Sequence, residues 1–159
     1  MLDEVWRFLR GGAPEGLYEH GHNIMLYKDD VPNVEVGVQV TGSFAPAGHV
    51  VASSLPGGLV AAATHVGPVT AIGDTHRAVR EWSEANGYRL AGPHWEIYGD
   101  PSPSTGDFDV EVFWSLVAPV LGLAAAAFPD DQLRGQPFHP DGQGRVGDPL
   151  QQQRAGTLA

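Results

Sequence analysis

The sequence predicts an α+β domain made of two similar halves that pair into one pseudo-symmetric sheet. Three observations predict this class. Valines alternate with other residues over 34–40, which is the spacing of a half-buried strand. An apolar stripe at helical spacing runs through 69–86 and is followed by a glycine, Gly87. A helix–strand–strand pattern in residues 5–36 recurs in residues 79–112.

The first half, about 1–53, is predicted from its own local patterns. Residues 3–9 form an amphipathic pattern that stops at two glycines, so we expect a short helix. An apolar run over 22–27 predicts a strand that ends at a charged turn. The alternating segment 34–40 follows, and then a short strand at 49–53.

The second half, about 58–117, opens with a strand over 59–65 that is rich in small residues. The helix over 69–86 follows, then a strand around Glu96 and a last strand over 109–117. In the helix the residues at helical spacing are Ile72, His76, Val79 and Trp82, and in the last strand Val110, Val112, Trp114 and Leu116 oppose Glu111, Phe113 and Ser115.

The pattern decays after residue 120. Residues 121–128 are an alanine-rich stub that fits a short strand or a helix. Residues 129–159 are rich in Gly, Pro and Gln without periodicity, so we expect a disordered tail. The domain is therefore predicted to span 1–120, with 121–159 outside it.

Composition excludes several classes of protein. The 159 residues include 9 Lys+Arg against 19 Asp+Glu, a formal net charge of −10, so the chain would repel a phosphate backbone and no nucleic-acid partner is expected. There is no cysteine and hence no thiolate metal site, and the histidines at 20 and 22 lack a third ligand, so we expect no metal and no cofactor. No apolar run approaches the roughly 18 residues that span a bilayer, and the chain is predicted to be cytoplasmic.

The segment 92–101 carries the strongest functional indication. Read as a strand, it places Glu96 on one face with His94 and Tyr98, whereas Trp95 and Ile97 point to the other face. Burying an acid among aromatic residues is costly unless its charge is compensated. A flat cation that stacks on the rings would compensate it, and so would a reaction that needs a proton held in an apolar pocket. Both readings stay open.

The internal repeat extends the site to the first half. In the pairing of the halves, Tyr27 matches Tyr98 and Met25 matches Glu96. Ligands usually bind in a cleft at the junction of two such halves. One element is missing, because the second half begins with a strand before its helix and the first half begins at the helix itself. An N-terminal deletion, a truncated start or a replacement by the stub at 121–128 would each explain this.

Several spaced residues between 58 and 101 resemble the GyrI-like family, also called the AraC effector-binding or multidrug-binding domain. They are Gly58, His65-Val66-Gly67-Pro68, Trp82, Gly87, Gly92-Pro93, Glu96, Tyr98, Asp100 and Pro101. The resemblance covers roughly residues 2–117. It implies two βαββ modules in an antiparallel sheet, helices on one face and a ligand cleft between the modules. By position, Glu96 looks like the acid of the family's pocket, with Tyr98 beside it.

The candidate ligand-binding residues are Glu96, Tyr98, Tyr27, Met25, Phe113 and His94. The tryptophans at 6, 82 and 114 are interpreted as core residues, and His65 as a brace of the strand-to-helix turn. We expect a stand-alone binder of bulky aromatic, cationic small molecules. The alternative, also implied by the resemblance, is a hydrolase that opens cyclopropane-containing compounds with Glu96 and Tyr98 as catalytic residues. A role in binding another protein is a third and less supported hypothesis.

Overall fold

The computed structural model describes residues 1–29, 31, 33–118, 145–147 and 157–158. Its helices and strands in chain order are α1 (Leu2–Gly11), β1 (Asn23–Tyr27), β2 (Val34–Val40), β3 (Ser53–Ser54), β4 (Val60–His65), the 3₁₀ helix η1 (Val69–Ala71), α2 (Ile72–Ala85), β5 (Arg89–Pro101), β6 (Phe108–Val117), β7 (Arg145–Gly147) and β8 (Thr157–Leu158).

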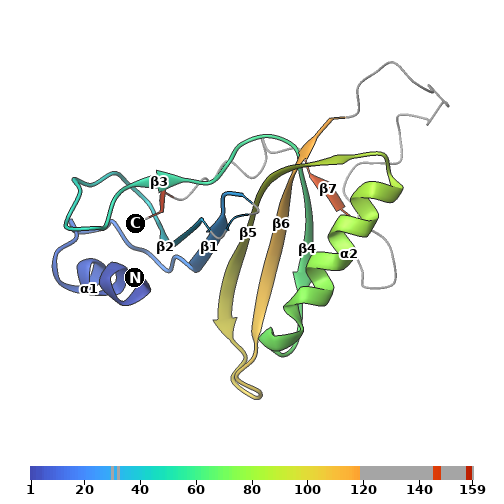
Figure 1. The fold of residues 1–159 in the computed structure, drawn as a ribbon. Coiled ribbons are helices and arrows are strands. Elements are labelled where there is room, and N and C mark those ends of the chain that lie inside the picture. Colours follow the sequence, from blue (N-terminus) through green and yellow to red (C-terminus); the bar gives the residue numbers. More distant parts are fainter. Residues whose placement is uncertain (30, 32, 119–144, 148–156, 159) are drawn as a thin grey trace.

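The strands form one antiparallel sheet whose centre has the order β2-β1-β5-β6-β4 (Figure 1). The two halves, α1-β1-β2 and α2-β5-β6, meet where β1 pairs with β5. The short strands β8 and β3 extend the sheet beside β2, and β7 extends it beside β4. The predicted α+β class is confirmed. In the described part of the chain, β4 precedes α2 but no strand precedes α1, so two complete βαββ modules stay a prediction.

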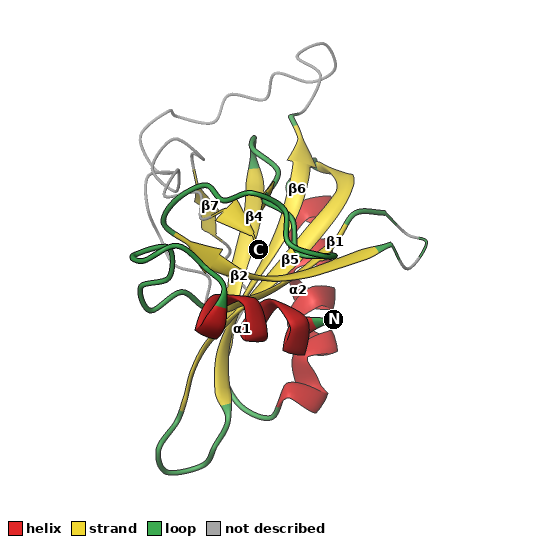
Figure 2. Cartoon of the chain, turned by 90° about the vertical axis from the view of Figure 1, so that its left-hand side faces the viewer, coloured by secondary structure: helices red, strands yellow, loops and turns green. Residues whose placement is uncertain are grey.

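Both helices lie on the same face of the sheet. Glu96 pairs with Met25 on β1 and with Val112 on β6, so these three side chains share a face. Helix α2 packs on this face against a cluster that includes Val112. Helix α1 packs on the same face at the other end, where the Trp6 indole donates a hydrogen bond to Asn23 Oδ1 over 3.0 Å. Figure 2 shows α1 in front and α2 behind it.

The opposite face buries a second set of apolar side chains, and Phe113 belongs to it. Phe113 pairs in register with Trp95, and their rings stack with centroids 5.3 Å apart. Phe113, one of the candidate ligand-binding residues, therefore lies on the face opposite Glu96 and was wrongly placed beside it. The cause is that both faces of β6 are buried, so alternation along that strand alone does not tell which face carries the site. The cluster contains Ile24, Leu26, Val60, Trp95 and Phe113, with Leu55 packed against it.

The turn between β4 and α2 is held by His65. Its Nδ1 atom lies 2.9 Å from Thr75 Oγ1 and its Nε2 atom 3.0 Å from the carbonyl oxygen of Pro68. Gly67 has a φ of +123°, a conformation that side chains with a Cβ rarely adopt. The predicted role of His65 as a brace is confirmed, and both of its ring nitrogens are occupied.

Two predictions at the periphery have mixed outcomes. The expected strand at 49–53 is reduced to Ser53–Ser54, preceded by a single bridge between Ala47 and Val50. In the predicted disordered tail, 145–147 and 157–158 form short strands, and the remaining residues of 121–159, including the stub at 121–128, lie outside the described residues. Neither described helix is long and apolar enough to span a membrane.

Candidate functional site

Glu96 lies near the centre of the sheet, on the face between the two helices. Its strand, β5, is flanked by β1 and β6, and the neighbouring side chains on that face are Met25 and Val112. Only 3% of the surface of Glu96 is exposed. A carboxyl group buried to this extent requires hydrogen-bond partners, because loss of its hydration is otherwise uncompensated.

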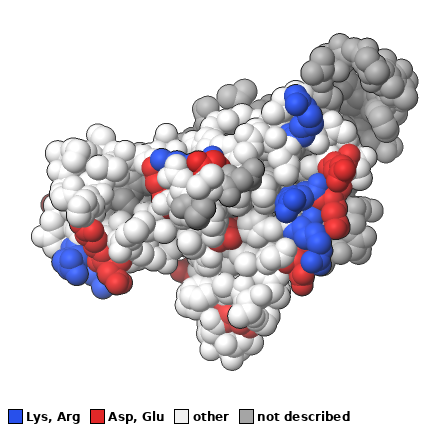
Figure 3. Space-filling model, in the orientation of Figure 1, with Lys and Arg blue, Asp and Glu red and all other residues white. Residues whose placement is uncertain are grey.

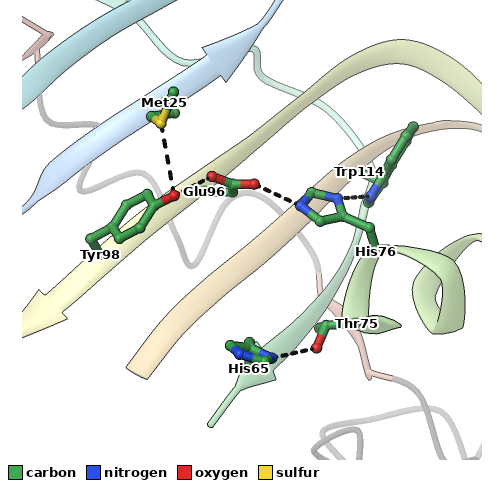
Figure 4. A network of polar contacts seen from close by, with 7 residues as sticks. All are labelled: Met25, His65, Thr75, His76, Glu96, Tyr98 and Trp114. Atoms are coloured by element: carbon green, nitrogen blue, oxygen red, sulfur yellow. Dashed lines mark hydrogen bonds and ion pairs between the residues drawn. The ribbon is translucent and has the colours of Figure 1, made fainter. Parts of the chain in front are cut away.

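Those partners form a chain of polar contacts across four elements, β1, β5, α2 and β6 (Figure 4). The Tyr98 hydroxyl donates to Glu96 Oε2 over 2.6 Å, and His76 Nε2, on α2, lies 2.8 Å from Glu96 Oε1. The indole N–H of Trp114 donates to His76 Nδ1 over 3.0 Å. The Tyr98 hydroxyl also lies 3.7 Å from the Met25 sulfur. Each carboxylate oxygen of Glu96 thus accepts one hydrogen bond.

The contact with Trp114 determines the state of His76. An indole N–H can only donate, so His76 Nδ1 must accept and carries no proton. The proton of a neutral imidazole then sits on Nε2, which donates it to Glu96 Oε1. Protonating Nδ1 would place two donors against each other. His76 is therefore a neutral donor to Glu96 in this arrangement, not a cation that balances its charge.

The environment keeps Glu96 ionised. Burial favours the neutral acid, but the hydrogen bonds from His76 and Tyr98 outweigh it and hold the pKa of Glu96 below its usual value. Burial and the hydrogen bond to Glu96 raise the pKa of Tyr98 far above its ordinary value. Burial, and then the charge of Glu96, also raise the pKa of Tyr27. At neutral pH the site is a carboxylate beside two protonated phenols.

Three rings stack across neighbouring strands next to Glu96. Tyr27, His94 and Trp114 occupy paired positions on β1, β5 and β6. The Tyr27 and His94 rings are 4.7 Å apart and 5° from parallel, and the His94 and Trp114 rings are 3.9 Å apart and 6° from parallel. The edge of His76 meets both His94 and Trp114, with centroids 5.6 and 5.8 Å away. The stack gives the site a rigid aromatic side.

Five of the six predicted site residues come together on this face: Glu96, Tyr98, Tyr27, Met25 and His94. Phe113 does not, as shown above. Sequence reasoning missed His76 as a functional residue, because it was assigned to the apolar stripe of its helix, and it assigned Trp114 to the core alone. One signal in the sequence could have identified His76. It is a titratable residue in the apolar stripe of a helix, and that stripe must face the sheet whose strand carries the buried acid.

The charged side chains of the molecular surface lie in groups of mixed sign. In Figure 3, acidic and basic side chains cluster over α1 and over α2, and a further group of both signs lies between them. The α2 cluster includes ion pairs of Arg77 with Asp74 and Glu81. Among the described residues no Lys or Arg forms an ion pair with Glu96, and no group of three His, Asp or Glu could hold a metal ion.

Comparison with protein families identifies the class of this domain. The model of the GyrI-like small molecule binding domain matches residues 8–117, which contain the end of α1, the central strands and the whole Glu96 network. The chain belongs to this family, and it is a small-molecule-binding domain. A search among curated proteins found no match.

Proposed function

We propose that this protein binds bulky aromatic cations, and that the ligand lies on the sheet face over Glu96. One observation carries the proposal: Glu96 is 3% exposed and ionised, yet the Tyr98 hydroxyl and the His76 imidazole that contact it are neutral donors. The hydrogen bonds hold this carboxylate ionised, but among the described residues no Lys or Arg pairs with its negative charge. A bound cation would pair with that charge.

The surrounding groups suit an aromatic ligand. A carboxylate can accept about four hydrogen bonds, and the network supplies one to each oxygen, so Glu96 retains acceptor capacity for a ligand N–H. Tyr27 and Tyr98 are half-buried and present rings beside it, where a delocalised cation would gain cation–π attraction. Met25 adapts to ligands of different shape. We expect broad recognition of flat cations, because stacking discriminates shape poorly.

The test is a fluorescence titration with a cationic rhodamine. Wild type should bind it saturably, and Glu96→Gln should bind it at least about tenfold more weakly, a difference of about 1.4 kcal/mol. The matched control is Glu111→Gln, which removes an exposed carboxylate from the other face of β6 and should leave the affinity unchanged. Equal affinities of wild type and Glu96→Gln would refute the proposal.

A hydrolase of strained, electrophilic small molecules is the second candidate. The observation that favours it is the 2.6 Å hydrogen bond between Tyr98 and an ionised Glu96. Because its pKa is lowered, Glu96 is better suited to accept a proton from an attacking water than to protonate a leaving group. Tyr98 and Tyr27 would then position the substrate.

The two functions are separable by mass spectrometry. Incubation with a cyclopropane-bearing alkylator should add one water to the compound if the protein is a hydrolase, and Glu96→Gln should abolish this. If the protein binds rhodamine and does not convert the alkylator, even when many equivalents are added, its function is binding and not hydrolysis.

A further inference from the structure

His76 lies where a neighbouring charge would favour a histidine cation. Its Nε2 atom is 2.8 Å from Glu96 Oε1, and 16% of the His76 side chain is exposed. An opposite charge at this distance favours the imidazolium form, although burial opposes it. A His76 cation would pair with Glu96 and neutralise the charge that a cationic ligand would use.

The other titratable and charged groups around His76 come from β1, β4, β5 and α2. The His94 ring on β5 meets the edge of His76, with centroids 5.6 Å apart. Among the described residues, Glu96 is the only acid that pairs with His76. The remaining groups are Tyr98 and Tyr27 beside Glu96, Arg80 one turn further along α2, and His65, which is held by Thr75 and the Pro68 carbonyl.

The orientation of Trp114 is fixed by contacts other than the one with His76. Its ring stacks on His94 with centroids 3.9 Å apart and planes 6° from parallel, and Arg80 lies over it at 5.6 Å. The indole N–H therefore stays directed at His76 Nδ1, 3.0 Å away (Figure 4). A proton on Nδ1 would face that N–H and leave two buried donors without an acceptor, which is costly.

We propose that Trp114 is a positioning residue that sets the charge selectivity of the site: its indole N–H keeps His76 neutral, which leaves the charge of Glu96 to a cationic ligand. The inference rests on the proposed function, because it assumes that the ligand lies over Glu96. It adds that the site keeps its preference for cations in mild acid, where a histidine in water is largely protonated. Trp114 acts through His76 and needs no contact with the ligand.

Nitrogen-15 NMR of the histidine rings at pH 6 reports the state of His76 without any ligand, and His76→Gln assigns its signals. In the wild type we expect one protonated nitrogen, Nε2, and one unprotonated nitrogen, Nδ1. Trp114→Phe keeps a ring against His94 but removes the indole donor, so both nitrogens of His76 should be protonated. The matched control is Trp95→Phe, the same change at a 5% exposed tryptophan on the other face of the sheet, and it should give the wild-type spectrum.

Dye binding reports the consequence for the ligand. The probe is a rhodamine ester that is cationic at both pH 8 and pH 6. Between pH 8 and pH 6, Trp114→Phe should lose at least about tenfold more affinity than the wild type, a difference of about 1.4 kcal/mol. Adding His76→Gln to Trp114→Phe should abolish this extra loss, because an amide takes up no proton in that range. His94 is present in all three proteins, so its own response to pH cancels in the comparison.

The two measurements separate this inference from the proposed function. A wild-type His76 with both nitrogens protonated at pH 6 would overturn the inference, even if Trp114→Phe does not fold. Equal losses of affinity in the wild type and Trp114→Phe between pH 8 and pH 6 would also overturn it, and the proposed function would then stand. Absence of dye binding by the wild type would instead refute the proposed function, and the spectra would still decide whether Trp114 keeps His76 neutral.

Discussion

Removing the Tyr98 hydroxyl tests whether the network stabilises the folded protein. In Tyr98→Phe, Glu96 Oε2 loses a 2.6 Å hydrogen bond while the ring of residue 98 is kept. A hydrogen bond to a charged group contributes about 1.5–3 kcal/mol. Tyr98 is half-buried, so water partly replaces the lost donor. We expect the free energy of unfolding at pH 7 to fall by about 1–2 kcal/mol and the melting temperature by about 4–8 °C.

The same variant has a predicted pH dependence. The pKa of Glu96 is lower in the folded than in the unfolded protein, so the ionised group contributes stability above its unfolded value and loses this contribution as the pH falls through the folded value. Without the Tyr98 donor, the pKa is lowered less. The stability difference between wild type and Tyr98→Phe should therefore be constant near neutral pH and shrink in acid, below the ordinary carboxyl value of 4.5.

Urea unfolding from pH 7 to pH 3 measures both effects. Tyr88→Phe is the matched control, because Tyr88 stacks on Trp82 and its hydroxyl has no hydrogen bond to any described residue. It should lose little stability and show no dependence on pH. A loss in Tyr98→Phe as small as that in Tyr88→Phe, or one that grows in acid, would refute the reasoning.

The remaining predictions concern the core, a close backbone contact and the helix donor. Phe113→Ala should destabilise the protein by about 3–5 kcal/mol in thermal unfolding. It should leave rhodamine affinity within about twofold, since Phe113 packs on Trp95 away from Glu96; a large loss of affinity in the folded variant would contradict its placement. Gly21→Ala should cost about 1–3 kcal/mol, because a Cβ there would overlap the carbonyl oxygen of Gln39, and unchanged stability would contradict that contact. His76→Leu leaves Glu96 with one donor and should lose about 1–3 kcal/mol at pH 7, whereas His76→Gln, which can donate, should recover part of it; equal losses would exclude a donor role.

Elements with a strong local period were predictable from the sequence. The valine alternation of β2 and the stripe of α2 each reflect one buried face, and Gly87, with a φ of +75°, follows the end of α2 as expected. Glu96 was found because an acid between aromatic residues is rare in a buried strand.

Contacts between elements were less predictable. Alternation gives two faces for each strand but not their identity, and β6 is buried on both, which is why Phe113 was misplaced. The contact of His76 with Glu96 joins α2 to β5 and depends on how the helix crosses the sheet. Periodicity within the helix does not fix that crossing, so the His76 donor and its link to Trp114 required the structure.

The most direct test of the account is the protonation of Glu96 itself. Carbon-13 NMR of its side-chain carboxyl group, titrated from pH 7 downward with and without a cationic rhodamine, reports the ionisation of this one residue. We predict a midpoint below 4.5 in the free protein and a still lower one with the cation bound. A midpoint above 4.5, or one that does not respond to saturating dye, would contradict the claim that Glu96 is an ionised anchor for a cation.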